Sequence, residues 1–225
     1  MSLGISLTPY KICNFDCIYC QLGKTGELTC ERKEYIKIED ALAELRSWLQ
    51  NNAEETKNLN YITISGSGEP TLNIKIGELI KEIKAITAIA VAVITNASLL
   101  NAIEVRGALL NADLVLPSLD TVIPKVFNKI NRPYQNIKIE EIINGLVNFK
   151  KEFRGKIWLE VMLVRGINDD LRHIRKLKEA IEQINPDRIQ LNSPVRTTAE
   201  PDVLAVNKNK LEKIKEILGD KAEII

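Results

Sequence analysis

The sequence lacks three features that would each indicate a particular class of protein. It has no excess of one charge, because 31 Lys and Arg residues balance 30 Asp and Glu residues. The net charge of +1 gives no electrostatic basis for a protein whose main task is to coat nucleic acid. No apolar run approaches the roughly 18 residues of a membrane-spanning helix. The first residues lack the basic flank and cleavage site of an export signal, so we expect a cytoplasmic protein without a membrane partner.

Cysteine and histidine are also scarce, with four cysteines and one histidine among 225 residues. Thiols stay reduced in the cytoplasm, so disulfide bonds are not expected there. Closely spaced cysteines in such a protein indicate a metal site or catalysis instead. The single histidine, His173, lies at the polar start of a predicted helix, and we assign no function to it.

A regular alternation of two patterns runs through the whole chain. Short runs rich in β-branched residues predict six strands: residues 4–9, 60–65, 88–95, 112–118, 156–164 and 187–192. Between them, apolar residues recur every three or four positions, as on one face of a helix. This alternation predicts an α/β fold with a parallel sheet and right-handed crossovers. Six units are too few for a closed eight-stranded barrel of ~250 residues, so we predict a partial, open (β/α)6 barrel, with a doubly wound sheet as the alternative.

No change of composition and no linker rich in Pro, Gly or Ser divides the chain. We therefore expect one domain over residues 1–225, with a short C-terminal extension over about residues 200–225 and no cap domain. In folds of this kind, functional residues gather at the carboxyl ends of the strands. The polar residues at or near these ends are Gly66, Ser67, Gly68, Glu69, Asn96, Ser118, Asp120, Glu160 and Asn192.

Three cysteines occupy the loop after the first predicted strand, at about residues 11–22. Cys13, Cys17 and Cys20 have the spacing C-x3-C-x2-C. Three thiolates so close together can hold three corners of an iron–sulfur cluster and leave one iron open, as a catalytic cluster requires. Zinc is the alternative, because Cys30 could supply the fourth ligand that a structural zinc site needs.

The segment Cys13-x-x-x-Cys17-x-Tyr19-Cys20 resembles the signature of the radical S-adenosylmethionine (SAM) enzymes. The resemblance implies a [4Fe–4S] cluster on the three cysteines, whose open iron chelates the amino and carboxylate groups of SAM. It implies reductive cleavage of SAM to a 5′-deoxyadenosyl radical that abstracts hydrogen from a substrate. The fold of this family is a partial six-unit β/α barrel, in agreement with the number of predicted strands.

The same resemblance gives roles to individual residues near the strand ends. Tyr19 matches an aromatic position near the adenine of SAM. The stretch Ser67-Gly68-Glu69-Pro70 resembles a Gly-Gly-Glu-Pro motif that receives the methionine amino group, with Ser67 in place of a glycine. Gly66 and Gly68 would let the main chain approach the ligand closely. The remaining residues expected to contact SAM or substrate are Asn96, Ser118, Asp120, Glu160 and Asn192.

Other interpretations of these residues remain open. Asn96 and Asp120 could instead cap the helices that follow them. Arg132 and Arg196 lie in loops on the same face and suit an anionic group of a substrate. Cys30 is either a passive thiol or a catalytic or redox residue.

The resemblance also bears on partners and substrate. Only Cys30 remains outside the motif, which is too few cysteines for a second cluster, so we expect an external electron donor, a flavodoxin or a ferredoxin. The residues of these motifs are most similar to those of small oxidoreductases related to the wyosine-tRNA synthesising branch. The second cysteine group of that branch is absent here. We expect an unidentified, macromolecular substrate, tRNA or protein. The alternatives are an enzyme of the glycyl-radical-activating type and a non-catalytic iron–sulfur redox carrier or sensor.

Overall fold

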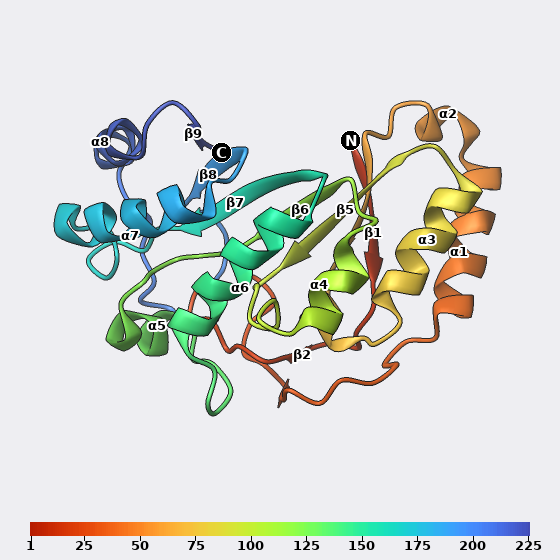
Figure 1. The fold of residues 1–225 in the computed structure, drawn as a ribbon, viewed down its shortest axis with the longest axis horizontal. Coiled ribbons are helices and arrows are strands. Elements are labelled where there is room, and N and C mark those ends of the chain that lie inside the picture. The colour runs from red at the N-terminus through yellow and green to blue at the C-terminus, as the bar shows by residue number, and fades with distance from the viewer.

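A single sheet of seven parallel strands runs through the molecule (Figure 1). The computed structural model describes residues 1–225. In spatial order the strands are β1 (Ser2–Ser6), β4 (Tyr61–Ser65), β5 (Ala90–Thr95), β6 (Leu114–Pro117), β7 (Lys156–Met162), β8 (Arg188–Asn192) and β9 (Ala222–Ile224). This order is also the order along the chain, so every crossover advances the sheet in the same direction. A doubly wound sheet reverses its direction at a switch point, so that alternative is wrong.

All six predicted strands are present, and the α/β class with a parallel sheet is confirmed. The first strand ends at Ser6 rather than at residue 9, where Pro9 has no N–H group for a sheet. A seventh strand, β9, pairs with β8 in the segment expected to be only a C-terminal extension. Its three residues are too few to show a periodic pattern in the sequence.

Helices follow the strands and cover the sheet. They are α1 (Ile38–Asn51), α2 (Ala53–Thr56), α3 (Ile76–Ile86), α4 (Ile103–Leu109), α5 (Pro124–Ile130), α6 (Ile139–Glu152), α7 (Leu171–Ile184) and α8 (Lys208–Leu218). Helix α3 contacts α1 and α4, and helix α7 contacts α6 and α8. Packing of helices in chain order around a sheet whose strands keep the same order is the architecture of a partial β/α barrel.

Local sequence explains where helix α7 begins and ends. The side chain of Asp170 accepts hydrogen bonds from the backbone N–H groups of Arg172 and His173, at 3.1 and 3.0 Å. This is the usual N-cap geometry. The helix ends at Asn185, whose φ of +51° is left-handed. The apolar residues at helical spacing are buried from Ile174 to Ile184, whereas Leu171 in the first turn is 39% exposed.

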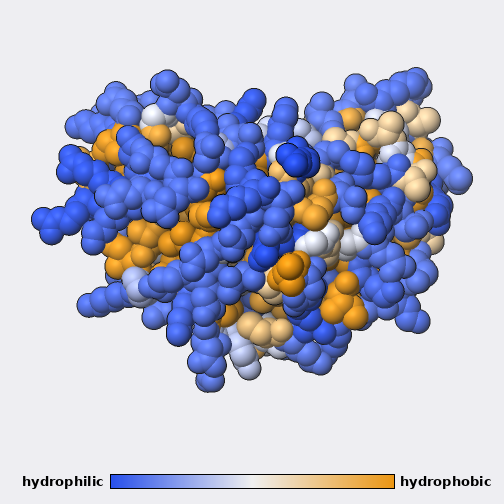
Figure 2. Space-filling model, viewed as in Figure 1, coloured by the Kyte–Doolittle hydropathy of each residue, from blue (hydrophilic) through white to orange (hydrophobic).

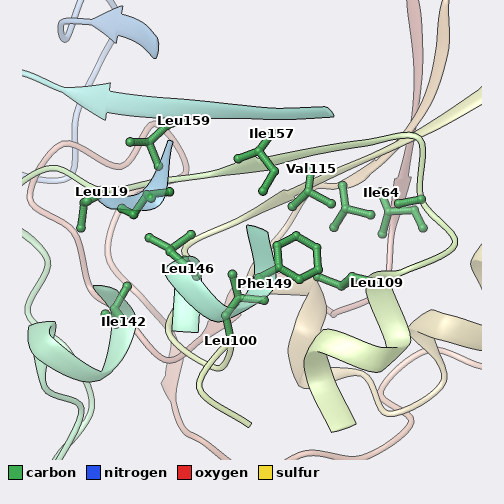
Figure 3. Close-up of a cluster of buried hydrophobic side chains, with 14 of the residues drawn as sticks. Ile64, Leu100, Leu109, Val115, Leu119, Ile142, Leu146, Phe149, Ile157 and Leu159 are labelled. Atoms are coloured by element: carbon green, nitrogen blue, oxygen red, sulfur yellow. The ribbon is translucent and has the colours of Figure 1, made fainter. Parts of the chain in front are cut away.

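A large apolar core fills the space between the helices and the sheet, with 42 buried side chains in one cluster. In Figure 3, Phe149 of α6 lies among Leu100, Leu109 and Val115. Its ring stacks on that of Phe153, with 4.7 Å between the centroids. Hydrophilic side chains cover most of the face seen in Figure 2, with apolar patches between them. None of the helices is both long enough and apolar enough to cross a membrane.

Truncation at the centre of this core tests the packing. We expect Phe149→Ala to lower the free energy of unfolding by about 3–5 kcal/mol, because a fully buried ring is lost and a cavity remains. Ile103→Ala is the control, since Ile103 is 72% exposed and its truncation should change stability by no more than about 0.5 kcal/mol. Urea unfolding of both variants measures the difference. Equal losses in the two variants would contradict the assigned core.

Candidate functional site

The cysteine loop is held against the carboxyl ends of the strands by its own backbone. The N–H of Ile18 donates to the carbonyl of Ile130, at the end of α5, over 2.9 Å. The N–H of Glu69, in the loop after β4, donates to the carbonyl of Ile12 over 3.1 Å. A short pair of strands, β2 (Ile12–Cys13) and β3 (Glu27–Leu28), closes the loop on itself. Its position is therefore set by contacts on two sides.

Cys13, Cys17 and Cys20 are free thiols and are all half-buried. Burial, and then the nearby carboxylate of Glu69, raise the pKa of Cys13 to about 12. Burial, and then Asp120, raise the pKa of Cys17 well above its usual value. Both thiols are therefore protonated in the metal-free chain, and binding of a metal centre displaces these protons.

Cys13, Cys17 and Cys20 lie within one loop and influence one another electrostatically. No group of three His, Cys, Asp or Glu side chains in the structure is placed to hold one ion. In a cubane cluster each thiolate binds a different iron, so the sulfur atoms stay farther apart. Three half-buried thiols in one loop, two of them with an amide donor at the sulfur atom, suit the ligand set of an iron–sulfur cluster.

The glycines after β4 are required by the packing of the chain on itself. Gly66 has a φ of +109°, and a Cβ there would lie 2.8 Å from the Cβ of Ser6. A Cβ on Gly68 would lie 1.7 Å from the carbonyl oxygen of Ile12. The sequence interpretation attributed these glycines to close approach of a ligand. In the structure, the close neighbours are β1 and the cysteine loop.

Glu69 is fully buried and joins the ends of β4 and β5. Its carboxylate accepts hydrogen bonds from the Thr71 N–H (3.0 Å), the Thr95 hydroxyl (2.6 Å) and the Asn96 N–H (2.8 Å). Burial raises the pKa of Glu69, and these donors partly offset the rise. A carboxylate with several donors and no cation fixes the backbone of this loop beside Cys13.

Asn96 follows β5 and faces the cysteine loop. Its Oδ1 accepts from the N–H of Ser98 over 3.0 Å, and its Nδ2 donates to Asn14 over 2.7 Å and to the sulfur of Cys13 at 3.7 Å. The alternative that Asn96 caps the next helix is wrong, because α4 begins at Ile103 with Ala102 as its N-cap. Asn96 closes a local turn and contacts the cysteine loop.

Asp120 is buried after β6 and binds the cysteine loop directly. Its Oδ2 accepts from the Tyr19 hydroxyl (2.5 Å) and from Asn131 Nδ2 (2.7 Å), and its Oδ1 accepts from the N–H of Met162 (2.9 Å). Burial raises the pKa of Asp120 to about 6. Helix α5 has Ile123 as its N-cap, so the capping interpretation of Asp120 is wrong as well.

Ser118, Glu160 and Asn192 form a row across β6, β7 and β8. Glu160 accepts hydrogen bonds from the Ser118 hydroxyl at 3.3 Å and from Asn192 Nδ2 at 3.1 Å. All three side chains are half-buried, and no cation pairs with Glu160. Each carboxylate oxygen of Glu160 already accepts one of these hydrogen bonds, and the lone-pair site that remains on each oxygen suits a hydroxyl or amine donor from a ligand.

The two arginines expected to bind an anion differ in their surroundings. Arg132 forms an ion pair with Glu200 over 2.5 Å and lies 3.8 Å from Asp16, so it is not a free cation. Arg196 is exposed and donates to Gln21 over 3.3 Å. A pairing across 68 residues, such as that of Arg132 with Glu200, has no signature in the sequence.

Three further residues complete the surroundings. Cys30 is partly exposed and contacts Asn14 rather than the other cysteines, and burial raises its pKa. His173 is buried, its Nε2 has no partner, and burial lowers its pKa. Asn131, the neighbour of Arg132 in the chain, is buried and donates to Asp120 and to the sulfur of Cys17. Its position beside the cysteines comes from the turn after α5 and could not be derived from spacing.

Comparison with known proteins identifies relatives over nearly the whole chain. A family model described as the radical SAM superfamily matches residues 7–178. The UPF0026 protein MJ1312 of Methanocaldococcus jannaschii is 34% identical over 224 residues, which are 100% of this chain and 68% of that protein. A protein of Brachyspira hyodysenteriae named GTPase Obg is 42% identical over 214 residues; the match covers 95% of this chain but only 31% of that protein.

A more distant relative and the solved structures agree with these matches. A probable dual-specificity RNA methyltransferase RlmN of Thermotoga sp. is 27% identical over 94% of this chain and 61% of its own length. A structure of TYW1 with a lysine-pyruvate adduct has a TM-score of 0.65 and 24% identity, over 96% of this chain and 72% of that chain. Streptococcus suis SuiB bound to S-adenosylmethionine has a TM-score of 0.72 and 17% identity, over 99% of this chain and 50% of that chain.

The contact between the loop after β4 and the cysteine loop, at Gly68 and Ile12, predicts an effect on stability. Gly68→Ala should lower the free energy of unfolding by about 1–3 kcal/mol or more, because the new methyl group collides with a backbone carbonyl. Gly107→Ala is the control, since nothing lies within 4 Å of a Cβ there, and it should stabilise α4 by up to about 1 kcal/mol. Denaturant unfolding of the iron-free protein measures both changes. A stable Gly68→Ala variant would show that the two loops are not in contact.

The raised pKa of Asp120 predicts a specific dependence on pH. The carboxyl proton of Asp120 is held more tightly in the folded protein than in the unfolded chain. The protonated carboxyl therefore contributes its full stabilisation below about pH 3.8, and this contribution is lost as pH rises through about 6. The difference between 3.8 and about 6 corresponds to roughly 3 kcal/mol. Asp120→Asn cannot titrate at this position. The free energy of unfolding of the wild type minus that of Asp120→Asn should therefore fall between pH 4 and pH 7, and a constant difference would contradict the assignment.

Proposed function

The chain belongs to the radical SAM superfamily, and on this premise we propose that it is an enzyme that cleaves SAM reductively and abstracts hydrogen from a substrate. Members of the family bind SAM and a [4Fe–4S] cluster, and SuiB has been solved with SAM. The observation that carries the proposal is the attachment of the cysteine loop to the polar strand ends. Tyr19 and Asn131 link Cys17 to Asp120, and Asn96 links Cys13 to Glu69.

We assign Cys13, Cys17 and Cys20 as the three protein ligands of the cluster. When bound, a cluster with one open iron supplies an electron to the sulfonium of SAM, which yields methionine and a 5′-deoxyadenosyl radical that removes hydrogen from the substrate. The raised pKa values of Cys13 and Cys17 mean that both thiols release protons when iron binds. Cys30 contacts Asn14 and is left out of this ligand set.

The residues at the strand ends divide the binding of SAM between them. The backbone of Ser67, Gly68 and Glu69 receives the methionine end, and the buried carboxylate of Glu69 holds this backbone in place through its bonds to Thr71 and Asn96. The row of Ser118, Glu160 and Asn192 faces the site with unused acceptor capacity, which suits the ribose hydroxyls. Tyr19 lies beside the cysteines and is fixed by Asp120; its ring flanks the adenine.

A row of partly buried hydrogen-bonding side chains favours this enzyme over a non-catalytic carrier or sensor. An electron carrier needs only ligands and a shielded cluster. It does not require a half-buried carboxylate such as Glu160, which accepts hydrogen bonds from Ser118 and Asn192 on neighbouring strands but has no cation beside it. Burial of such a group has a free-energy cost, which a ligand with hydroxyl donors offsets.

The electron and the substrate come from outside the residues of the site. The one cysteine that remains, Cys30, cannot hold an auxiliary cluster, so we assign electron delivery to a flavodoxin or ferredoxin.

Among the relatives, the RNA methyltransferase RlmN aligns with 94% of the chain, which supports RNA as the substrate. Addition of bulk transfer RNA to the reduced enzyme should then accelerate cleavage of SAM. Acceleration by a protein fraction but not by RNA would contradict this assignment.

Individual cysteine substitutions test the ligand set. After anaerobic reconstitution, Cys13→Ala, Cys17→Ala and Cys20→Ala should each lose the iron and sulfide that the wild type retains, because a cubane cannot stay bound to two thiolates. Cys30→Ala is the matched control and should keep the full iron content. Loss of iron in the Cys30 variant would instead indicate a site with four cysteines, as in an electron carrier.

Turnover separates the enzyme from the carrier directly. Under dithionite, the reconstituted wild type should convert SAM to methionine and 5′-deoxyadenosine, detected by liquid chromatography. We expect Glu160→Gln to fold normally but to bind SAM about tenfold to a hundredfold more weakly, since one charge-assisted hydrogen bond contributes on the order of 1.5–3 kcal/mol. A reduced protein that leaves SAM intact would contradict the proposed function.

A further inference from the structure

Two asparagine side chains donate hydrogen bonds to the sulfur atoms of the assigned cluster ligands. Asn96 Nδ2 lies 3.7 Å from the sulfur of Cys13, and Asn131 Nδ2 lies 3.6 Å from the sulfur of Cys17. Each donor comes from a different part of the chain, 83 and 114 residues away from its cysteine. The fold thus brings one amide to each of two ligands.

The orientation of both amides is fixed by their other partners. Asn131 Nδ2 also donates to Asp120 Oδ2 over 2.7 Å, so a flipped amide would place its oxygen against a carboxylate. The Oδ1 of Asn96 accepts from the N–H of Ser98 over 3.0 Å, and Nδ2 donates to Asn14 Oδ1 over 2.7 Å. The N–H groups of both side chains therefore point toward the sulfur atoms.

A buried cation lies in the same loop. Lys11 is 4% exposed and stands two residues before Cys13. Its ammonium donates to the carbonyl of Gly23, on the far side of the cysteine loop, and no carboxylate pairs with it. Lysine is almost never buried without a partner, because the loss of hydration is costly. An anionic group that the chain itself does not contain would offset that cost, and a cluster on three thiolates is anionic.

We propose that Lys11, Asn96 and Asn131 raise the reduction potential of the cluster and so make it accessible to the electron donor. Reduction adds one negative charge to the cluster. Positive charge and N–H dipoles beside the sulfur atoms stabilise the reduced state more than the oxidised state, and thus raise the potential. These three are positioning residues, and the inference rests on the proposed function because it takes Cys13 and Cys17 as cluster ligands.

Potentiometric titration of the reconstituted protein, followed by electron paramagnetic resonance, measures this effect without any turnover. Lys11→Gln keeps a donor for the Gly23 carbonyl but removes the charge, and should make reduction about tenfold less favourable, or about 59 mV for one electron. Lys11→Arg keeps the charge and should retain the wild-type potential. Lys24→Gln is the matched control in the same loop. Because the Lys24 side chain is 69% exposed, the reduction potential of the cluster in this variant should equal that of the wild type.

The amides are tested in the same titration. Asn131→Ala and Asn96→Ala should each make reduction several-fold less favourable, whereas Asn192→Ala should not, because the Asn192 amide faces Glu160 instead of a sulfur atom. If Asn131→Ala does not fold, Asn96→Ala and Lys11→Gln decide the question. Potentials equal to that of the wild type in variants with full iron content would overturn this inference alone. A wild-type protein that binds no cluster would overturn the proposed function instead.

Discussion

The buried carboxylate of Asp120 is the contact on which the arrangement of the site depends. It holds the Tyr19 hydroxyl, the Asn131 amide and the backbone of Met162. One side chain therefore joins the cysteine loop, the turn after α5 and strand β7. No cation balances it, and burial raises its pKa to about 6. Burial of this carboxylate thus lowers the stability of the protein while it keeps the cysteines in place beside the strand ends, as is common where function and stability compete.

The order of the strands explains why residues far apart in sequence meet here. All seven strands are parallel and follow one another across the sheet, so their carboxyl ends lie along one edge. Ser118, Glu160 and Asn192 form hydrogen bonds across neighbouring strands for this reason. Gly66 then lets the loop after β4 pack on Ser6 of β1, and Gly68 lets the same loop pack directly on the cysteine loop. Topology brings the groups to one place, and the two loops fix their distances.

Local patterns in the sequence predict the elements well and the contacts between loops poorly. The six strands and the cysteine motif follow from period and spacing, which are local properties. The pairing of Arg132 with Glu200 and the contact of Asn131 with Cys17 depend on how distant loops fold over one another. The capping alternatives for Asn96 and Asp120 were wrong because the next helices start several residues later. Strand β9 was missed because it has only three residues and depends on its pairing with β8.

The central claim is that three cysteines hold a cluster whose fourth iron is free to bind SAM. Electron paramagnetic resonance of the reduced, reconstituted wild-type protein, recorded with and without saturating SAM, tests this claim most directly. Binding of SAM to the open iron changes the ligands of the cluster, so the account predicts a clear change in the g-values of the spectrum. An identical spectrum in the presence of SAM would contradict it.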